Sequence, residues 1–135
     1  MALVKQFSIF LENSPGRLAN LVDALAQNGI RILALGIAEA GNYGIVRMIV
    51  DNDDKALEAM HKANMAVNQT EVIIIDLFNL GDAVRILSQQ GTNIDYAYTM
   101  DRGRAVIKVN EPGEALKSLS ANNLKVYSKG QTSIS

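Results

Sequence analysis

The 135-residue chain has no cysteine, one histidine, no tryptophan and almost no net charge. Without cysteine there can be no disulfide, thiol nucleophile or zinc–thiolate site. A formal net charge of -1 lacks the basic excess that nucleic acids and anionic membrane surfaces require, so we expect neither as a partner. The four tyrosines and three phenylalanines are scattered, which argues against the stacking surface of an RNA-recognition sheet.

Signals for catalysis, cofactor binding and membrane insertion are also missing. His61 has no Cys, Asp or Ser at a spacing that would form a catalytic dyad, so it is interpreted as a solvated helix residue. The acidic run 51–54 lacks the glycine and glutamate of a calcium loop, and no Walker or G-x-G-x-x-G sequence exists. Apolar runs fall far short of the roughly 20 residues that span a bilayer, and residues 1–6 lack a signal-peptide core. We expect a cytoplasmic protein with no enzymatic activity, cofactor or metal.

The sequence does contain one order of structural elements twice. β-rich segments predict strands at 3–11, 30–39, 45–50, 66–77, 93–100, 104–109 and 124–127. Apolar residues at helical spacing predict helices that begin near 14–15, 51–54, 80 and 111–113. Ser14 is predicted to cap the first helix with Pro15 in its first turn, and residues 129–135 are expected to be a frayed polar tail.

A comparison of the two halves indicates an internal duplication. Five residues recur 62 positions later, where Leu18, Val22, Leu25, Gly29 and Ile32 match Leu80, Val84, Leu87, Gly91 and Ile94. Gly29 and Gly91 are each predicted to end a helix in the left-handed conformation. Residues 64–67 match 123–126, so the offset falls to 59 there. We therefore predict two βαββαβ units, 1–71 and 72–135, which should pack closely because domains of about 65 residues are marginal alone.

The leading candidate site is the segment Asn13-Ser14-Pro15-Gly16-Arg17-Leu18, between the first strand and the first helix. It combines an amide side chain, a glycine that permits close approach and the free N–H groups of a helix start. These features suit the carboxylate of a small ligand, although an ordinary capped loop would also explain them. The motif N-x-P-G-x-L in this position resembles the opening of an ACT domain, and residues 3–128 as a whole resemble small stand-alone tandem ACT proteins.

The resemblance implies an α+β fold and a mode of ligand binding. ACT domains are ferredoxin-like βαββαβ units that commonly pair, so that two four-stranded antiparallel sheets join side by side with helices on one face. In many members amino acids bind at the seam, where the loop of one unit meets the second strand of its neighbour. By motif, Asn13 matches the ligand-holding asparagine and Pro15, Gly16 and Leu18 match its frame. Asn93, followed by Ile94, matches the facing asparagine.

The two units depart from the family pattern in complementary ways. The second unit lacks Pro-Gly, and its loop around Asn79 is about three residues shorter than the first. The first unit has Arg31 where the facing asparagine would lie. The hypothesis is therefore one competent site per chain, with a degraded counterpart near Asn79 and Arg31. The competent site is formed by Asn13, Ser14, Pro15, Gly16, Arg17 and Leu18 against Asn93 and Ile94.

These interpretations predict a regulatory protein that senses a free amino acid. An open sheet edge favours a homodimer, and a target enzyme is a further expected partner. Two alternatives remain open. The first is a ligand-free dimerisation or docking module for a partner protein. The second is an enzyme acting on an amino-acid-like substrate, which would have only Tyr43, Tyr96, Tyr98 and isolated carboxylates for catalysis.

Overall fold

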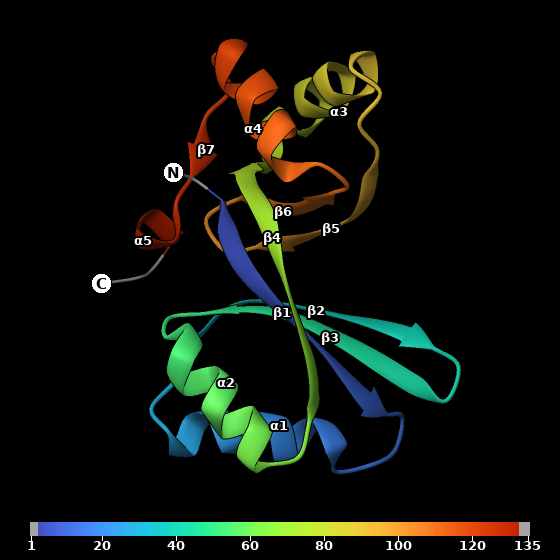
Figure 1. Ribbon diagram of the computed structural model, residues 1–135, viewed down its shortest axis with the longest axis vertical. Helices are drawn as coiled ribbons and strands as arrows, with labels where there is room; N and C mark the ends of the chain where they lie inside the picture. The colour runs from blue at the N-terminus through green and yellow to red at the C-terminus, as the bar shows by residue number, and fades with distance from the viewer. Residues whose placement is uncertain (1–2, 133–135) are drawn as a thin grey trace. The chain divides into compact units, whose positions relative to one another are not determined.

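Strand β4 (Ala66–Asp76) contributes to both of the compact units into which the chain divides. The computed structural model describes residues 3–132. The N-terminal unit comprises residues 5–70, and the described part of the C-terminal unit comprises residues 71–132 with residues 3–4 (Figure 1). The Leu3 side chain packs against the core of the C-terminal unit.

The N-terminal unit has the element order βαββαβ. Its elements are β1 (Val4–Glu12), α1 (Arg17–Gln27), β2 (Ile32–Ala40), β3 (Tyr43–Val50), α2 (Asp53–Lys62) and the first part of β4. The strands lie in the order β2-β3-β1-β4, and β3 is antiparallel to both β1 and β2. This is the ferredoxin-like arrangement that the sequence predicts, with β2 as an outer strand.

The C-terminal unit repeats this plan. The rest of β4 is followed by η1 (Leu77–Asn79), α3 (Leu80–Gln89), β5 (Ile94–Met100), β6 (Arg104–Val109), α4 (Pro112–Ala121), β7 (Val126–Tyr127) and α5 (Lys129–Thr132). Its strands lie in the order β7-β4-β6-β5, which is the N-terminal order with each strand replaced by its counterpart. The predicted fold of two ferredoxin-like units, with antiparallel strands and helices, is confirmed.

Each unit has its own core, formed between one face of its sheet and its two main helices. Side chains alternate between the two faces of a strand, so every second residue of the central strands enters the core. In the N-terminal unit these residues are Phe7, Ile9, Val46, Met48 and Val50, which pack against Leu21, Leu25, Ala56, Ala59 and Met60. In the C-terminal unit they are Ile73, Ile75, Ala105, Ile107 and Val109, which pack against Ala83, Leu87, Ala115, Leu116 and Leu119.

All four long helices end in the same left-handed turn. The second residue after the end of each helix has a positive φ, at Gly29 (69°), Asn64 (58°), Gly91 (79°) and Asn123 (59°). The next N–H then donates back to the last turn of the helix, from Ile30 to Leu25, Met65 to Met60, Thr92 to Leu87 and Leu124 to Leu119. The glycine pair and the asparagine pair are the residues that match between the halves of the sequence, so the repeat extends to the backbone conformation.

The structure corrects two local predictions. Ser14 does not cap the first helix: α1 begins at Arg17, and the residue that precedes it is Gly16 with φ 89°. The reason is that the Ser14 N–H donates to the Glu12 carbonyl oxygen, which closes a turn before the helix. Residues 129–132 form the short helix α5 instead of a frayed tail, because the Arg104 Nη1 donates to the Gln131 carbonyl oxygen at 2.7 Å. The rest of the predicted tail, 133–135, lies outside the described residues.

Candidate ligand-binding site

The predicted binding loop is a tight connection of four residues between β1 and α1. The Asn13 N–H donates to the Asn42 carbonyl oxygen at 2.7 Å, which ties the loop to the turn between β2 and β3. Gly16 has a backbone conformation that residues with a side chain rarely adopt, and a Cβ at that position would meet no atom within 4 Å. The glycine is therefore required for the direction of the chain, and the space beside it is open.

The start of α1 is electrostatically suited to an anion. Within the described chain, no side chain caps this helix, and its first turn contains no acidic residue. The first N–H groups of a helix have no partner inside the helix and carry the positive end of its dipole. A carboxylate beside Arg17 and Leu18 would therefore be stabilised.

A pocket of about 150 Å³ lies beside this loop. Its walls come from the end of β1, the loop, the start of α1 and the middle of β2 and β3. The lining residues are Leu11, Glu12, Asn13, Ser14, Arg17, Leu18, Ile37, Gly44 and Val46. The structure thus brings four predicted site residues, Asn13, Ser14, Arg17 and Leu18, to one pocket, while Pro15 and Gly16 shape the loop behind them.

Glu12 is a pocket residue that the sequence reasoning missed. The Arg17 Nη2 lies 3.3 Å from the Glu12 Oε2, and the two side chains are 50% and 63% exposed. The sequence does place opposite charges on the two sides of the loop, which could have indicated an ion pair. Whether the two side chains meet depends on the conformation of the loop. An exposed ion pair contributes only about 0–1 kcal/mol, so both charged groups can be redirected to a ligand at small cost.

A larger hollow lies on the other side of the Glu12–Arg17 pair. It has a volume of about 440 Å³, and Asn20, Tyr43 and Asn64 line it together with this pair. The C-terminal unit has a hollow of about 400 Å³ at the equivalent place, where Asp82 and Asn123 stand at the positions of Asn20 and Asn64. Because both units have this feature, we attribute it to the packing of the two helices in this fold.

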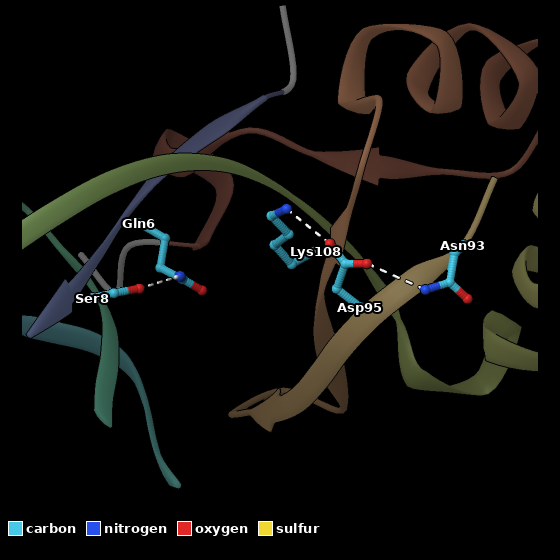
Figure 2. A network of polar contacts seen from close by, with 5 residues as sticks. All are labelled: Gln6, Ser8, Asn93, Asp95 and Lys108. Atoms are coloured by element: carbon cyan, nitrogen blue, oxygen red, sulfur yellow. Dashed lines mark hydrogen bonds and ion pairs between the residues drawn. The ribbon is translucent and has the colours of Figure 1, made fainter. Parts of the chain in front are cut away.

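Asn93 and Ile94 belong to the C-terminal unit. Asn93 is exposed just before β5, and its Nδ2 donates to the Asp95 Oδ1 at 3.2 Å, while its side-chain oxygen points away from Asp95 (Figure 2). The Lys108 Nζ lies 2.8 Å from the Asp95 Oδ2. Ile94 is half-buried and packs against the unit's core.

The charge of Asp95 fixes the orientation of Asn93. The hydrogen bond from Lys108, and then the one from Asn93, lower the pKa of the Asp95 carboxyl below its ordinary value. Asp95 is therefore an anion at neutral pH and holds the amide nitrogen of Asn93, so the amide oxygen is directed away from Asp95 (Figure 2). Sequence reasoning found Asn93 but missed Asp95 and Lys108, which meet only through the pairing of β5 with β6.

The positions predicted for a degraded counterpart have other surroundings. Asn79 ends η1, which replaces the open loop of the N-terminal unit, and the preceding Phe78 is 96% exposed. The Arg31 N–H donates to the Asp51 Oδ1 at 3.0 Å and its carbonyl oxygen accepts from the Asp51 N–H. The second connection is shorter than the first, with three residues between β4 and α3 against four between β1 and α1, which is a smaller difference than the three residues predicted.

The remaining candidates for catalysis or metal binding are dispersed. His61 is exposed on α2 beside Glu58 and Lys62. Among residues 3–132, no group of three or more His, Asp or Glu residues is placed to hold a metal ion. None of the described helices is long and apolar enough to cross a membrane.

The chain thus consists of two ferredoxin-like repeats, with a pocket beside the first strand–helix junction. The family model of the ACT domain pair matches residues 1–134. The chain belongs to this family, and an ACT domain pair is a regulatory module. No curated protein sequence matches the chain.

Solved structures with similar folds support this assignment. Protein BT0572 from Bacteroides thetaiotaomicron is 32% identical, with a TM-score of 0.89 over 97% of this chain and 96% of that one. The ligand-free regulatory subunit of aspartate kinase from Thermus thermophilus is 19% identical, with a TM-score of 0.64 over 90% and 92%. The same subunit from Thermus flavus is 18% identical, with a TM-score of 0.63 over 87% and 90%. At these identities the two kinase subunits share the fold.

Proposed function

We propose that the protein is a cytoplasmic regulatory sensor of a free amino acid, without catalytic activity of its own. The observation that carries the proposal is the pocket beside Asn13, Ser14, Arg17 and Leu18, which lies at an uncapped helix start. The α-carboxylate of the amino acid would accept hydrogen bonds from the first N–H groups of α1 and from the Asn13 amide. Two of the similar structures are regulatory subunits of aspartate kinase, which is consistent with such a role.

The second half of the site is proposed to come from the C-terminal unit. In this hypothesis the seam forms between two chains, where the β2 edge of one chain meets the β5 edge of the other. Asn93 of one chain then faces the loop at Asn13 of the other. The Asn93 amide oxygen, directed away from Asp95, would accept a hydrogen bond from the ligand's ammonium group. Each chain would contribute one such site.

We further propose that the protein is a homodimer. β2 and β5 are outer strands, and an unpaired strand edge is a template for pairing with another chain. Large apolar side chains are exposed in both units, with Leu18 and Val22 on α1, Leu35 and Ile37 on β2, and Leu77, Phe78 and Val84 in the η1–α3 segment. Ligand binding would regulate a target enzyme by favouring one state of association, which requires a differential affinity of about 1–3 kcal/mol.

A docking module that binds no ligand is the second candidate function. The exposed Phe78 favours it, because a phenylalanine that is 96% exposed, in a segment that also exposes Leu77 and Val84, is a suitable anchor for a protein partner. Under this function, no amino acid would stabilise the protein, and the Phe78→Ser variant would lose the partner.

A thermal-shift panel tests the proposed function. The purified chain is incubated with each of the twenty amino acids, with S-adenosylmethionine and with nucleotides. A ligand at a hundredfold excess over its Kd stabilises the folded state by about 2.7 kcal/mol, which is readily measured as a rise in Tm. The proposal requires that at least one amino acid raises Tm and that the nucleotides do not; a panel with no response would refute it.

Substitutions then locate the site. Asn13→Ala should weaken binding of the responding amino acid by roughly 1–3 kcal/mol, since it leaves ligand groups without their partner. Asn93→Ala should weaken it similarly if the seam is correct. Asn68→Ala is the matched control, because Asn68 is exposed on β4 in the N-terminal unit and does not line the pocket. Unchanged affinity in Asn13→Ala would contradict the site assignment.

A further inference from the structure

The 150 Å³ pocket has an apolar interior. Leu11, Leu18, Ile37 and Val46 line it from four different elements, and Ile37 pairs with Val46 across β2 and β3. Ile37 is 55% exposed in the chain, although a core-facing side chain on a strand is ordinarily buried. Covering this part of the surface with an apolar group therefore lowers the free energy.

The mouth of the same pocket has one charge of each sign. Glu12 and Arg17 are joined by a single contact of 3.3 Å, and both line the pocket. A zwitterion can insert between them so that its carboxylate lies on Arg17 and its ammonium group lies on Glu12. Each charged group then exchanges one opposite charge for another, and none is left without compensation.

We propose, building on the function proposed above, that this site selects α-amino acids with aliphatic side chains. Arg17 and the first turn of α1 bind the α-carboxylate, and the side chain enters the space between Leu18 and Ile37. Glu12 accepts from the α-ammonium group, which has a further N–H for the Asn93 amide oxygen proposed above. The size of the pocket sets the upper limit, because an apolar cavity of about 150 Å³ accommodates a ring the size of benzene. The side chains of valine, leucine and isoleucine are smaller than such a ring and fit this space, whereas the benzyl group of phenylalanine exceeds the ring by one methylene and an indole is larger still.

The polar amino acids are disfavoured for a separate reason. The ammonium group of lysine or the hydroxyl of threonine would be placed against Leu11 and Val46, where the apolar wall offers no hydrogen-bond partner. Burying a polar group without a partner is costly, so these ligands should bind at least about tenfold more weakly than leucine.

Isothermal titration calorimetry on the full chain tests both parts of the proposal. The probes are L-leucine, L-isoleucine and L-valine. L-lysine, L-threonine and L-tryptophan are titrated separately for comparison. Two analogues of leucine each lack one charge: 4-methylpentanoate lacks the ammonium group, and 3-methylbutylamine lacks the carboxylate. The proposal predicts that an aliphatic amino acid binds tightest and that both analogues bind at least about tenfold more weakly.

The Glu12→Gln variant isolates the role of the ion pair. It should lower the ratio of leucine affinity to 4-methylpentanoate affinity about tenfold, because the variant lacks the carboxylate that binds the ammonium group of leucine. Glu58→Gln is the matched control, since Glu58 also forms an exposed ion pair, with Lys62 at 3.2 Å. An unchanged ratio in Glu12→Gln, or equal binding of leucine and 4-methylpentanoate by the unmodified chain, overturns the role of Glu12.

The panel also separates this inference from the function on which it rests. If lysine, threonine or tryptophan binds tightest, the aliphatic selectivity is wrong and the proposed sensor function stands. If no amino acid binds, the sensor function fails, and this inference fails with it.

Discussion

Substitution of Gly16 by alanine measures how strongly the binding loop depends on one backbone angle. Gly16 has φ 89°, and a Cβ at this position would meet nothing within 4 Å. The variant therefore creates no steric clash with neighbouring residues, and its cost is the strain of a left-handed alanine, about 1–2 kcal/mol. Alanine also lowers the conformational entropy of the unfolded chain, which offsets about 0.4–1 kcal/mol of this strain. We therefore expect the free energy of unfolding to fall by about 1 kcal/mol.

Gly113→Ala provides the matched control for this measurement. Gly113 lies in α4, its φ is not positive, and a Cβ there also meets nothing within 4 Å. The effect on the unfolded chain is common to both variants, so the difference between their free energies of unfolding isolates the strain. Urea denaturation followed by circular dichroism should give a difference of at least about 1–2 kcal/mol, with Gly113→Ala the more stable variant. Equal stabilities would show that the loop adapts to alanine, and the argument that Gly16 sets its conformation would be refuted.

Three further outcomes are expected. Leu87→Ala should lower the free energy of unfolding by about 2–5 kcal/mol in urea denaturation, because Leu87 is fully buried in the C-terminal core. Phe78→Ser should change stability by less than about 0.5 kcal/mol and shift a dimer toward monomer in light scattering, because Phe78 is 96% exposed. Folding lowers the pKa of Asp95 below its ordinary value of 3.8, so Asp95 stabilises the fold at neutral pH and this contribution is lost as the pH falls through 3.8 to the lower folded value. Asp95→Asn should therefore reduce the acid-induced loss of stability between about pH 5 and pH 2, measured by urea unfolding at each pH.

The features predicted correctly from the sequence are those encoded by neighbouring residues. The stripe of Leu21 and Leu25 specifies the buried face of α1, and both side chains are 1% exposed. Gly29 and Gly91 end their helices as predicted, because the left-handed turn requires a residue that tolerates positive φ. Spacing and composition over a few residues therefore predict the elements, and the twofold recurrence of their order predicts the fold.

The features that were missed depend on contacts between distant residues. Ser14 followed by Pro15 is a good helix start in isolation, but the loop is held by the bond from Asn13 to Asn42, which lies in another turn. The last helix, α5, is attached by Arg104, 27 positions before its partner Gln131. Local propensity carries no information on such contacts, so the Ser14 cap and the frayed state of residues 129–132 were predicted wrongly, while the buried helical stripes were predicted correctly.

The same distinction explains how one duplicated fold can hold two different surfaces. The cores of both units require the same pattern of buried residues, so the helices and strands match between the halves. The connection from the first strand to the first helix carries no such requirement. In the N-terminal unit it is an open loop with a pocket and the Glu12–Arg17 pair, whereas in the C-terminal unit it is the 3₁₀ turn η1, which exposes Phe78. Differences in ligand or partner between the repeats are therefore expected in these connections. Exchanging residues 13–16 for the η1 segment should remove the proposed ligand binding of the N-terminal unit while its core stays folded.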